Sequence, residues 1–277
     1  MLLFNFEIFN KLISQKTGII FRNDQRENLI RALKIANLWS EINSDFDNVI
    51  NKLNLSTFKS DIWQKYINVI ANKETFFFRE SEQLLFFIKL IPANHNRTIR
   101  ILSLPCSTGE EVYSLAILLE SNDYSNYNLY GVDIRADNIE KAGRGKYDSN
   151  SFREPVPLEY RRYFEGDSIS ETYRYANSDS VLAIKKELLG KMSFRCSNLF
   201  EMQDFSDNYF DIIVCRNLLI YFNSETRLSA LKKFWKLLAP GGYLALGHND
   251  FIHEYFNALN GIDSTVGKCI YKKRLKH

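Results

Sequence analysis

Two adjacent carboxylates, Glu110 and Glu111, begin a predicted helix within LSLPCSTGEEVYSLAILL, residues 102–119. A strand, a turn and a helix in this order form the ligand-binding turn of parallel α/β sheets, where the ligand meets the helix N-terminus. A dinucleotide site would need several glycines here so that the backbone can approach a pyrophosphate, but the turn has only Gly109. Because two carboxylates would also repel phosphates, the pattern disfavours a dinucleotide and favours a cationic ligand.

A further carboxylate, Asp133, ends the predicted strand 128–134, roughly 20 residues after the first turn. An acidic side chain at this place can accept hydrogen bonds from both ribose hydroxyls of a nucleoside, although a solvent-facing strand end would show the same pattern. S-adenosylmethionine fits these features, because it carries a ribose, no phosphate and two cationic groups, the sulfonium and the α-amino group. Glu111 can meet that amino group through a charge-assisted hydrogen bond.

The two glutamates also have the spacing of a helix capping box with Ser107 or Thr108. One glutamate can cap the helix while the other binds the ligand, and the pattern alone does not assign these roles. We expect Glu111 to make the ligand contact and Glu110 to cap the helix.

Alternating strands and helices must position these residues. Apolar runs predict strands at 100–104, 128–134, 209–216 and 241–247, the last after a turn at APGG, and GKCIYKK predicts one more. Helical periodicity lies between them, at 110–120, 136–145 and 224–238. Parallel βαβ units follow, and their carboxyl ends would gather five places into one site: 107–111, Asp133, Asn198-Leu199, Arg216-Asn217 and Gly247-His248.

The rest of the chain predicts two domains. Residues 1–91 show helical patterns and no convincing strand, which indicates a small N-terminal helical domain and a linker. Pro92 and ANHNR form a polar break, after which residues 92–277 form a Rossmann-like α/β domain. Alternating, β-rich segments at about 160–195 predict a small antiparallel insertion, and the main sheet resumes near SFRCSN.

Composition narrows the class of protein. The 277 residues carry 36 basic and 33 acidic side chains, a net charge of +3 that gives no general argument for nucleic acid or a membrane surface. No apolar run is long enough to span a bilayer, and the start of the chain lacks the basic leader of a signal peptide. We read the four widely spaced cysteines as reduced thiols of a cytoplasmic protein with no metal site. No dimerisation stripe is visible, so we expect a monomer.

Five segments together carry a more specific signal. ETFFFRE, CSTGEEVYSLA, YGVDI, FDIIVCRNLLIYF and LAPGGYLALGHND stand in order across residues 74–250. In this order and spacing the chain resembles the CheR family, the S-adenosylmethionine-dependent methyltransferases that esterify glutamates of bacterial chemotaxis receptors. Taken alone, the aromatic triplet in ETFFFRE is better explained as packing between two domains than as part of a site.

The resemblance implies a role for each matching position. Arg79 would lie near the methyl-transfer centre, and Tyr221 would face the transferring methyl group or the incoming substrate; these two are the candidate catalytic residues. The implied cofactor-binding residues are Thr75, Arg79, Glu111, Asp133, Asn198, Leu199, Arg216 and Asn217. The implied partner is the cytoplasmic domain of methyl-accepting chemotaxis receptors.

Some positions depart from the family pattern. Lys73 stands where an asparagine is common, and EEVYS replaces the usual EEPYS. The segment GDSISETYRYANSDS lacks the glycine pair with which some members grip a receptor tether peptide, so tether binding is not predicted.

Two other functions remain open at this point. A methyltransferase of another signalling protein, RNA or a small molecule would share the cofactor site, although the near-neutral charge and the absence of an NPPY motif argue against a nucleobase substrate. A non-catalytic S-adenosylmethionine-binding regulator would bind the cofactor without turnover, but Arg79, Asn217 and Tyr221 are all in place.

Overall fold

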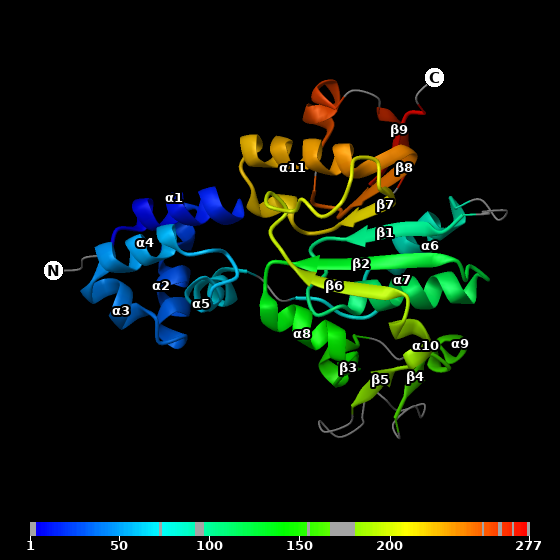
Figure 1. Ribbon diagram of the computed structural model, residues 1–277, viewed down its shortest axis with the longest axis horizontal. Helices are drawn as coiled ribbons and strands as arrows, with labels where there is room; N and C mark the ends of the chain where they lie inside the picture. The colour runs from blue at the N-terminus through cyan, green and yellow to red at the C-terminus, as the bar shows by residue number, and fades with distance from the viewer. Residues whose placement is uncertain are drawn as a thin grey trace.

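The computed structural model describes residues 4–71, 74–91, 97–153, 156–166, 181–250, 252–259, 262–267 and 269–275. A helical domain lies at one end of the molecule and an α/β domain at the other (Figure 1). Lys73 and most of the segment without the glycine pair, 167–180, lie outside the described residues.

The helical domain confirms the amphipathic patterns read from the sequence. The Asn5 side chain caps the first helix by accepting from the N–H of Ile8, and Gly18 ends it with a left-handed φ of 80°. Phe9 and Ile13 from its apolar face are fully buried. The elements are α1 Phe6–Thr17, η1 Asn23–Gln25, α2 Arg26–Ile35, α3 Trp39–Ser44, α4 Phe46–Leu55 and α5 Asp61–Ile70.

The α/β domain is built on a seven-stranded sheet in the order β6-β2-β1-β7-β8-β10-β9. The first five strands are parallel, whereas β10 runs antiparallel to both β8 and β9. The strands are β1 Ile99–Ser103, β2 Tyr127–Asp133, β6 Met192–Cys196, β7 Phe210–Cys215, β8 Leu238–Leu246, β9 Ile262–Gly267 and β10 Ile270–Lys273. The connecting elements are α7 Glu110–Ser121, α8 Ala136–Arg144, η4 Leu219–Tyr221, α11 Ser224–Leu237 and η5 His253–Ala258. The predicted mixed α/β class with a mostly parallel sheet is confirmed.

Alternation along the strands divides the core between the two faces of the sheet. Leu102 of β1 and Ile213 of β7 belong to one hydrophobic cluster, while Ile101 and Ile212 belong to the other. The first cluster also contains the buried residues of the helical domain, so this core runs without a break from α1–α5 onto the sheet. The second cluster joins the opposite face to α7 and the small sheet.

Helix α6, Ser81–Lys89, lies in the α/β domain rather than in the helical one. Its Leu84, Phe87 and Ile88 are buried in the second cluster together with α7, and the Phe87 ring meets Tyr243 of β8 edge-on. The predicted polar break therefore follows a helix that already packs on the sheet, and the domain boundary at 91/92 stays a prediction. Residues 92–96, which form the break, are outside the described part of the chain.

The antiparallel insertion is a three-stranded sheet in the order β3-β5-β4, with β5 antiparallel to both neighbours. Its first strand, β3, follows α8 directly, and the range of about 160–195 for the insertion stays a prediction. The chain rejoins the main sheet at β6, as predicted. The elements of the insertion are β3 Lys146–Tyr147, η2 Ser149–Ser151, α9 Leu158–Arg161, β4 Phe164–Glu165, β5 Leu182–Ile184 and α10 Lys186–Leu189.

Two details near the C-terminus differ from the sequence prediction. The APGG segment is not a turn before a strand: β8 runs through it, with an irregular register against β7. A Cβ on Gly242 would lie 2.7 Å from the carbonyl oxygen of Asp211, so the glycine permits this close backbone approach. Strand β9 was not predicted and pairs with β10 at the edge of the sheet.

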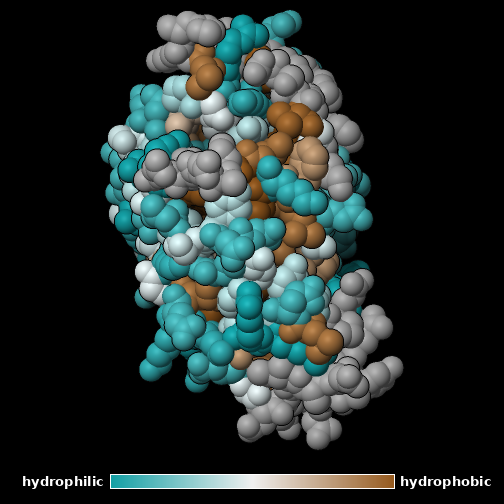
Figure 2. Space-filling view, turned by 90° about the vertical axis from the view of Figure 1, so that its right-hand side faces the viewer, coloured by the Kyte–Doolittle hydropathy of each residue, from teal (hydrophilic) through white to brown (hydrophobic). Residues whose placement is uncertain are grey.

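The end of the molecule turned away from the helical domain carries a mainly hydrophilic surface with a band of hydrophobic residues across it (Figure 2). Among the described residues, no helix has both the length and the hydrophobicity needed to cross a membrane. All four cysteines carry free thiols, and Cys106 and Cys215 are buried.

Candidate active site

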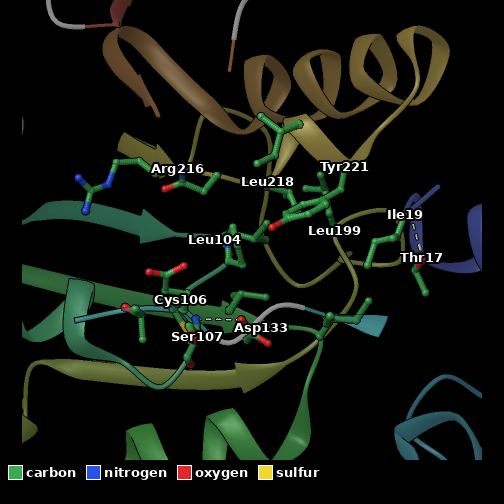
Figure 3. Close-up of a pocket in the computed structure, with 18 of the residues that line it drawn as sticks. Thr17, Ile19, Leu104, Cys106, Ser107, Asp133, Leu199, Arg216, Leu218 and Tyr221 are labelled. Atoms are coloured by element: carbon green, nitrogen blue, oxygen red, sulfur yellow. Dashed lines mark hydrogen bonds between the residues drawn. The ribbon is translucent and has the colours of Figure 1, made fainter. Parts of the chain in front are cut away.

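A pocket of about 320 Å³ opens at the carboxyl ends of the parallel strands. Thr17 and Ile19, from the end of the helical domain's first helix, lie across this pocket from the turn that carries Cys106 and Ser107 (Figure 3). All nine residues singled out from the sequence line this one pocket: Thr75, Arg79, Glu111, Asp133, Asn198, Leu199, Arg216, Asn217 and Tyr221. Of the fifth predicted place, Gly247-His248, neither residue lines it.

The turn after β1 uses its own backbone N–H groups within the protein. The N–H of Ser107 donates to the Asp133 carboxylate at 2.8 Å, and the N–H of Gly109 donates to the Cys106 carbonyl at 3.0 Å. Gly109 is required for packing, since a Cβ there would lie 2.9 Å from the side chains of both Ala142 and Tyr147. These two N–H groups are therefore already bonded within the protein and are not offered to a phosphate.

Asp133 is almost fully buried and holds the turns around it. Its carboxylate accepts from the N–H groups of Ser107 and Arg135 and from the Asn138 side chain at 2.8–3.1 Å. Burial raises the pKa of this carboxyl above the ordinary value of 3.8, although the three hydrogen bonds oppose the rise. The side chain still lines the pocket, so a ligand hydroxyl can donate to it.

The two adjacent glutamates have separate environments. Glu110 is 1% exposed and accepts from the hydroxyls of Thr108 and Ser151 at 2.6 and 2.8 Å, turned away from the pocket. The predicted capping box is wrong: the N-cap residue of α7 is Gly109, and no side chain caps the helix. Thr108 instead donates to the Glu110 carboxylate, because this buried charge needs hydrogen-bond donors.

Glu111 faces the pocket and forms a buried ion pair with Arg216. One carboxylate oxygen accepts from Ser103 at 2.8 Å, and the other lies 2.6 Å from Nε of Arg216. The Arg216 guanidinium also donates to the carbonyl of Arg79 at 2.9 Å and lies 3.6 Å from the Glu80 carboxylate. The Arg216 guanidinium therefore connects the loop after β7 to helix α7 and to the segment that carries Arg79.

The aromatic triplet 76–78 serves packing while Arg79 reaches the pocket. Phe77 is buried and stacks on Phe152 with ring centroids 4.6 Å apart. Phe78 and Glu80, on either side of Arg79, both have left-handed φ values, 59° and 52°. The N–H of Phe78 donates to the Ser114 hydroxyl at 2.9 Å, and the Arg216 bond fixes the carbonyl of Arg79. The packing and binding interpretations of this segment therefore apply to different residues.

Asn198 anchors the loop after β6 to the helical domain. Its amide nitrogen donates to the carbonyl of Lys16, and its amide oxygen accepts from the N–H of Phe200 at 3.0 Å. The side chain is buried, and neighbouring Leu199 adds an apolar surface to the pocket.

The helical domain supplies residues that the sequence reading missed. Ile70 and Ala71 line the pocket beside Thr17 and Ile19, and the N–H of Ile20 donates to the carbonyl of Tyr221 at 3.0 Å. Nothing in the local pattern marks these residues, because they look like ordinary apolar positions at helix ends. Their role depends on how α1 and α5 dock on the sheet.

A match to a protein family identifies this arrangement. The CheR methyltransferase SAM-binding domain matches residues 73–267. The chain belongs to the CheR methyltransferase family. The match also begins before the predicted domain boundary, in agreement with the packing of α6 on the sheet.

Characterised CheR relatives extend over nearly the whole chain. A chemotaxis protein methyltransferase of Campylobacter jejuni is 33% identical over 254 residues, which cover 91% of this chain and 90% of that protein. The chemotaxis protein methyltransferase of Escherichia coli is 30% identical over 278 residues, with 96% and 90% covered. The chain is therefore a methyltransferase whose cofactor is S-adenosylmethionine.

The pocket of this CheR protein fits that cofactor in its donor set. Asp133 offers an acceptor for hydroxyls and Glu111 an acceptor for an amine, while Leu104, Val132 and Leu199 provide apolar walls. The backbone N–H groups of Ser107 and Gly109 are bonded within the protein, and the cofactor carries no pyrophosphate that would need them. Within the described ranges, no three His, Cys, Asp or Glu side chains gather closely enough to hold a metal ion.

Proposed function

We propose that this protein transfers a methyl group from S-adenosylmethionine to glutamate side chains in the cytoplasmic domain of chemotaxis receptors. The observation that carries the proposal is the single pocket into which residues from five separate motifs converge. The names of its relatives in Campylobacter jejuni and Escherichia coli, chemotaxis protein methyltransferases, support a receptor as the substrate.

We assign the cofactor contacts as follows. Asp133 holds the ribose hydroxyls, and Glu111 holds the α-amino group. Asn198 and Leu199 line the adenosine region, and Asn217 the reaction cleft. Arg216 is assigned mainly to balancing the Glu111 charge, because its Nε lies 2.6 Å from that carboxylate. Thr75 and Arg79 approach from the segment before α6.

Bound S-adenosylmethionine supplies an electrophilic methyl group on a sulfonium. The acceptor glutamate needs no general base, because a free glutamate with a pKa of about 4.3 is already ionised at neutral pH. The protein must instead align the carboxylate with the methyl group and exclude water. Arg79 orients the carboxylate, and Tyr221 hydrogen-bonds to it.

A product test decides between this function and the other methyltransferases. Radiolabelled cofactor is incubated with the protein and a purified receptor cytoplasmic domain, and the product is treated with mild alkali. Glutamate methyl esters release labelled methanol, whereas N-methyl products do not. Alkali-stable label would contradict the proposal, and a receptor domain with the acceptor glutamates changed to glutamine should take up no label.

We further propose that the protein acts as a monomer in the cytoplasm. A single sharp species of about one chain mass in analytical ultracentrifugation, with and without cofactor, is the expected result. A dimer that persists at low concentration would contradict it.

A further inference from the structure

Asp250 is a buried carboxylate behind the pocket, in the loop that follows β8. It is 2% exposed and is not among the residues that line the pocket. Its oxygens accept from the backbone N–H groups of Asn217 at 2.7 Å, Ile220 at 3.2 Å and Gly247 at 3.1 Å. The N–H of Leu219 also contributes a hydrogen bond to this carboxylate.

Most of the hydrogen bonds to the Asp250 carboxylate come from the loop that carries Asn217 and Tyr221. Asn217 has a left-handed φ of 61°, and the 3-10 turn Leu219–Tyr221 follows directly. This conformation leaves several N–H groups without partners inside the loop itself. The Asp250 carboxylate satisfies these donors together, so it fixes the path of the loop from behind.

The loops after β8 and β7 are in close contact around Asp250. A Cβ on Gly247 would lie 2.8 Å from the Asp250 carboxylate and 3.0 Å from the backbone nitrogen of Asn217. Gly247 therefore lets the β8 loop press against the β7 loop. On the other side, the helical domain holds the carbonyl of Tyr221 through Ile20.

We propose that Asp250 is the positioning residue of the methyl-transfer loop: it binds the backbone N–H groups of Asn217 and Ile220, and thereby holds the loop that carries Tyr221, without touching cofactor or substrate. The proposal rests on the proposed role of Tyr221 in transfer. It assigns to Asp250 an effect on turnover that exceeds its effect on cofactor binding, because Asp133 and Glu111 stand on other elements.

The first test measures the loop itself and needs no methyl acceptor. Asp250→Asn keeps the size of the side chain but replaces one acceptor oxygen with a donor that faces N–H groups. Amide hydrogen exchange should quicken at least about tenfold at residues 217–220 and stay unchanged at the 106–109 turn. Asp211→Asn is the matched control, since Asp211 is a buried carboxylate that accepts from the N–H of Arg100 at 2.9 Å, away from the pocket. Equal exchange at 217–220 in Asp250→Asn and wild type would overturn the proposal.

The second test separates positioning from general stability. In Asp250→Asn, kcat should fall about 10- to 100-fold while the Kd for S-adenosylmethionine changes less than about fivefold. The reason is that a displacement of the loop by about 1 Å lowers the rate of transfer more than it weakens cofactor binding. The loss should be smaller in a Tyr221→Phe background, because two residues that act through one group are not additive. Equal losses in both backgrounds, or an unchanged kcat, would overturn the proposal. Failure of the wild type to methylate receptors would instead contradict the proposed function and leave the exchange test decisive for Asp250.

Discussion

The turn after β1 and the loop after β7 use the same device with different consequences. Each contains a residue in the left-handed region, Ser107 with φ 47° and Asn217 with φ 61°. The N–H of that residue donates to a buried carboxylate: Asp133 at the end of the neighbouring strand β2, or Asp250 in the loop after the neighbouring strand β8. Asp133 also lines the pocket, whereas Asp250 lies behind it. A buried carboxylate that binds loop N–H groups can therefore have two roles: Asp133 can also contact the ligand, whereas Asp250 only holds the loop.

Arg216 connects the two loops, so breaking its ion pair should have the largest effect. Arg216→Met leaves Glu111 as a buried charge without its partner, and such a loss lowers the free energy of unfolding by about 3–5 kcal/mol. The buried geometry supports this size, because the Arg216 side chain is 3% exposed. Urea denaturation measures the change.

The control for Arg216 is an exposed pair. Arg195 and Asp204 are 42% and 54% exposed, so Arg195→Met should change the unfolding free energy by less than about 1 kcal/mol. Similar losses of unfolding free energy in Arg216→Met and Arg195→Met would show that burial does not determine how much an ion pair stabilises this protein.

Asp133→Ala should weaken cofactor binding about 100-fold. Hydrogen bonds to a charged group contribute about 1.5–3 kcal/mol each, and about 1.4 kcal/mol corresponds to a factor of ten. Isothermal titration calorimetry with S-adenosylmethionine measures the Kd, and Asp133→Asn serves as the variant with the smaller structural change. An unchanged Kd would remove the ribose assignment and, with it, the distinction between Asp133 and Asp250.

Tyr221→Phe should lower turnover about tenfold and leave the cofactor Kd unchanged. The hydroxyl is assigned to the ionised substrate carboxylate, and a hydrogen bond to a charged group contributes about 1.5–3 kcal/mol, of which about 1.4 kcal/mol already corresponds to a factor of ten. Steady-state methyl transfer, measured beside calorimetry, separates the two quantities. A parallel loss of cofactor affinity would place Tyr221 on the cofactor and contradict its role with the substrate.

The pH dependence of stability should show the smallest effect. Burial raises the pKa of Asp133 and of Asp250 above the ordinary value of 3.8. Each contributes stability that is full below that value and is lost as pH rises through the raised pKa of the folded protein. Relative to Asp250→Asn, the wild type should therefore lose unfolding free energy as the pH rises from 4 to 8, on the order of 1 kcal/mol. Chemical denaturation across this pH range measures it, and a flat difference would contradict the raised pKa.

The chemistry of the pocket was readable from the sequence because its residues stand at the ends of strands that are themselves easy to recognise. Asp133 and Arg216 follow buried strands directly, and parallel strands bring their carboxyl ends to one edge. Helix α6 was missed because its mixture of aromatic and apolar residues, SEQLLFFIK, gives weak periodicity, and its packing on α7 decides its domain. The pattern alone did not assign the roles of Glu110 and Glu111, since both start the same helix; Glu111 was expected to meet the ligand, and it is the one that lines the pocket.

The sequence by itself determined the fold class, the cofactor and nine of the residues that line the pocket, because each depends on short segments with a regular repeat or a distinctive turn. Only the tertiary structure decided what Glu110 contacts, which residues of the helical domain line the pocket, and what Asp250 holds. Those outcomes rest on contacts between distant parts of the chain, such as Ile20 with Tyr221 and Arg216 with Glu111. Packing of the two domains creates the first of these contacts and the parallel sheet creates the second, and no local pattern encodes either.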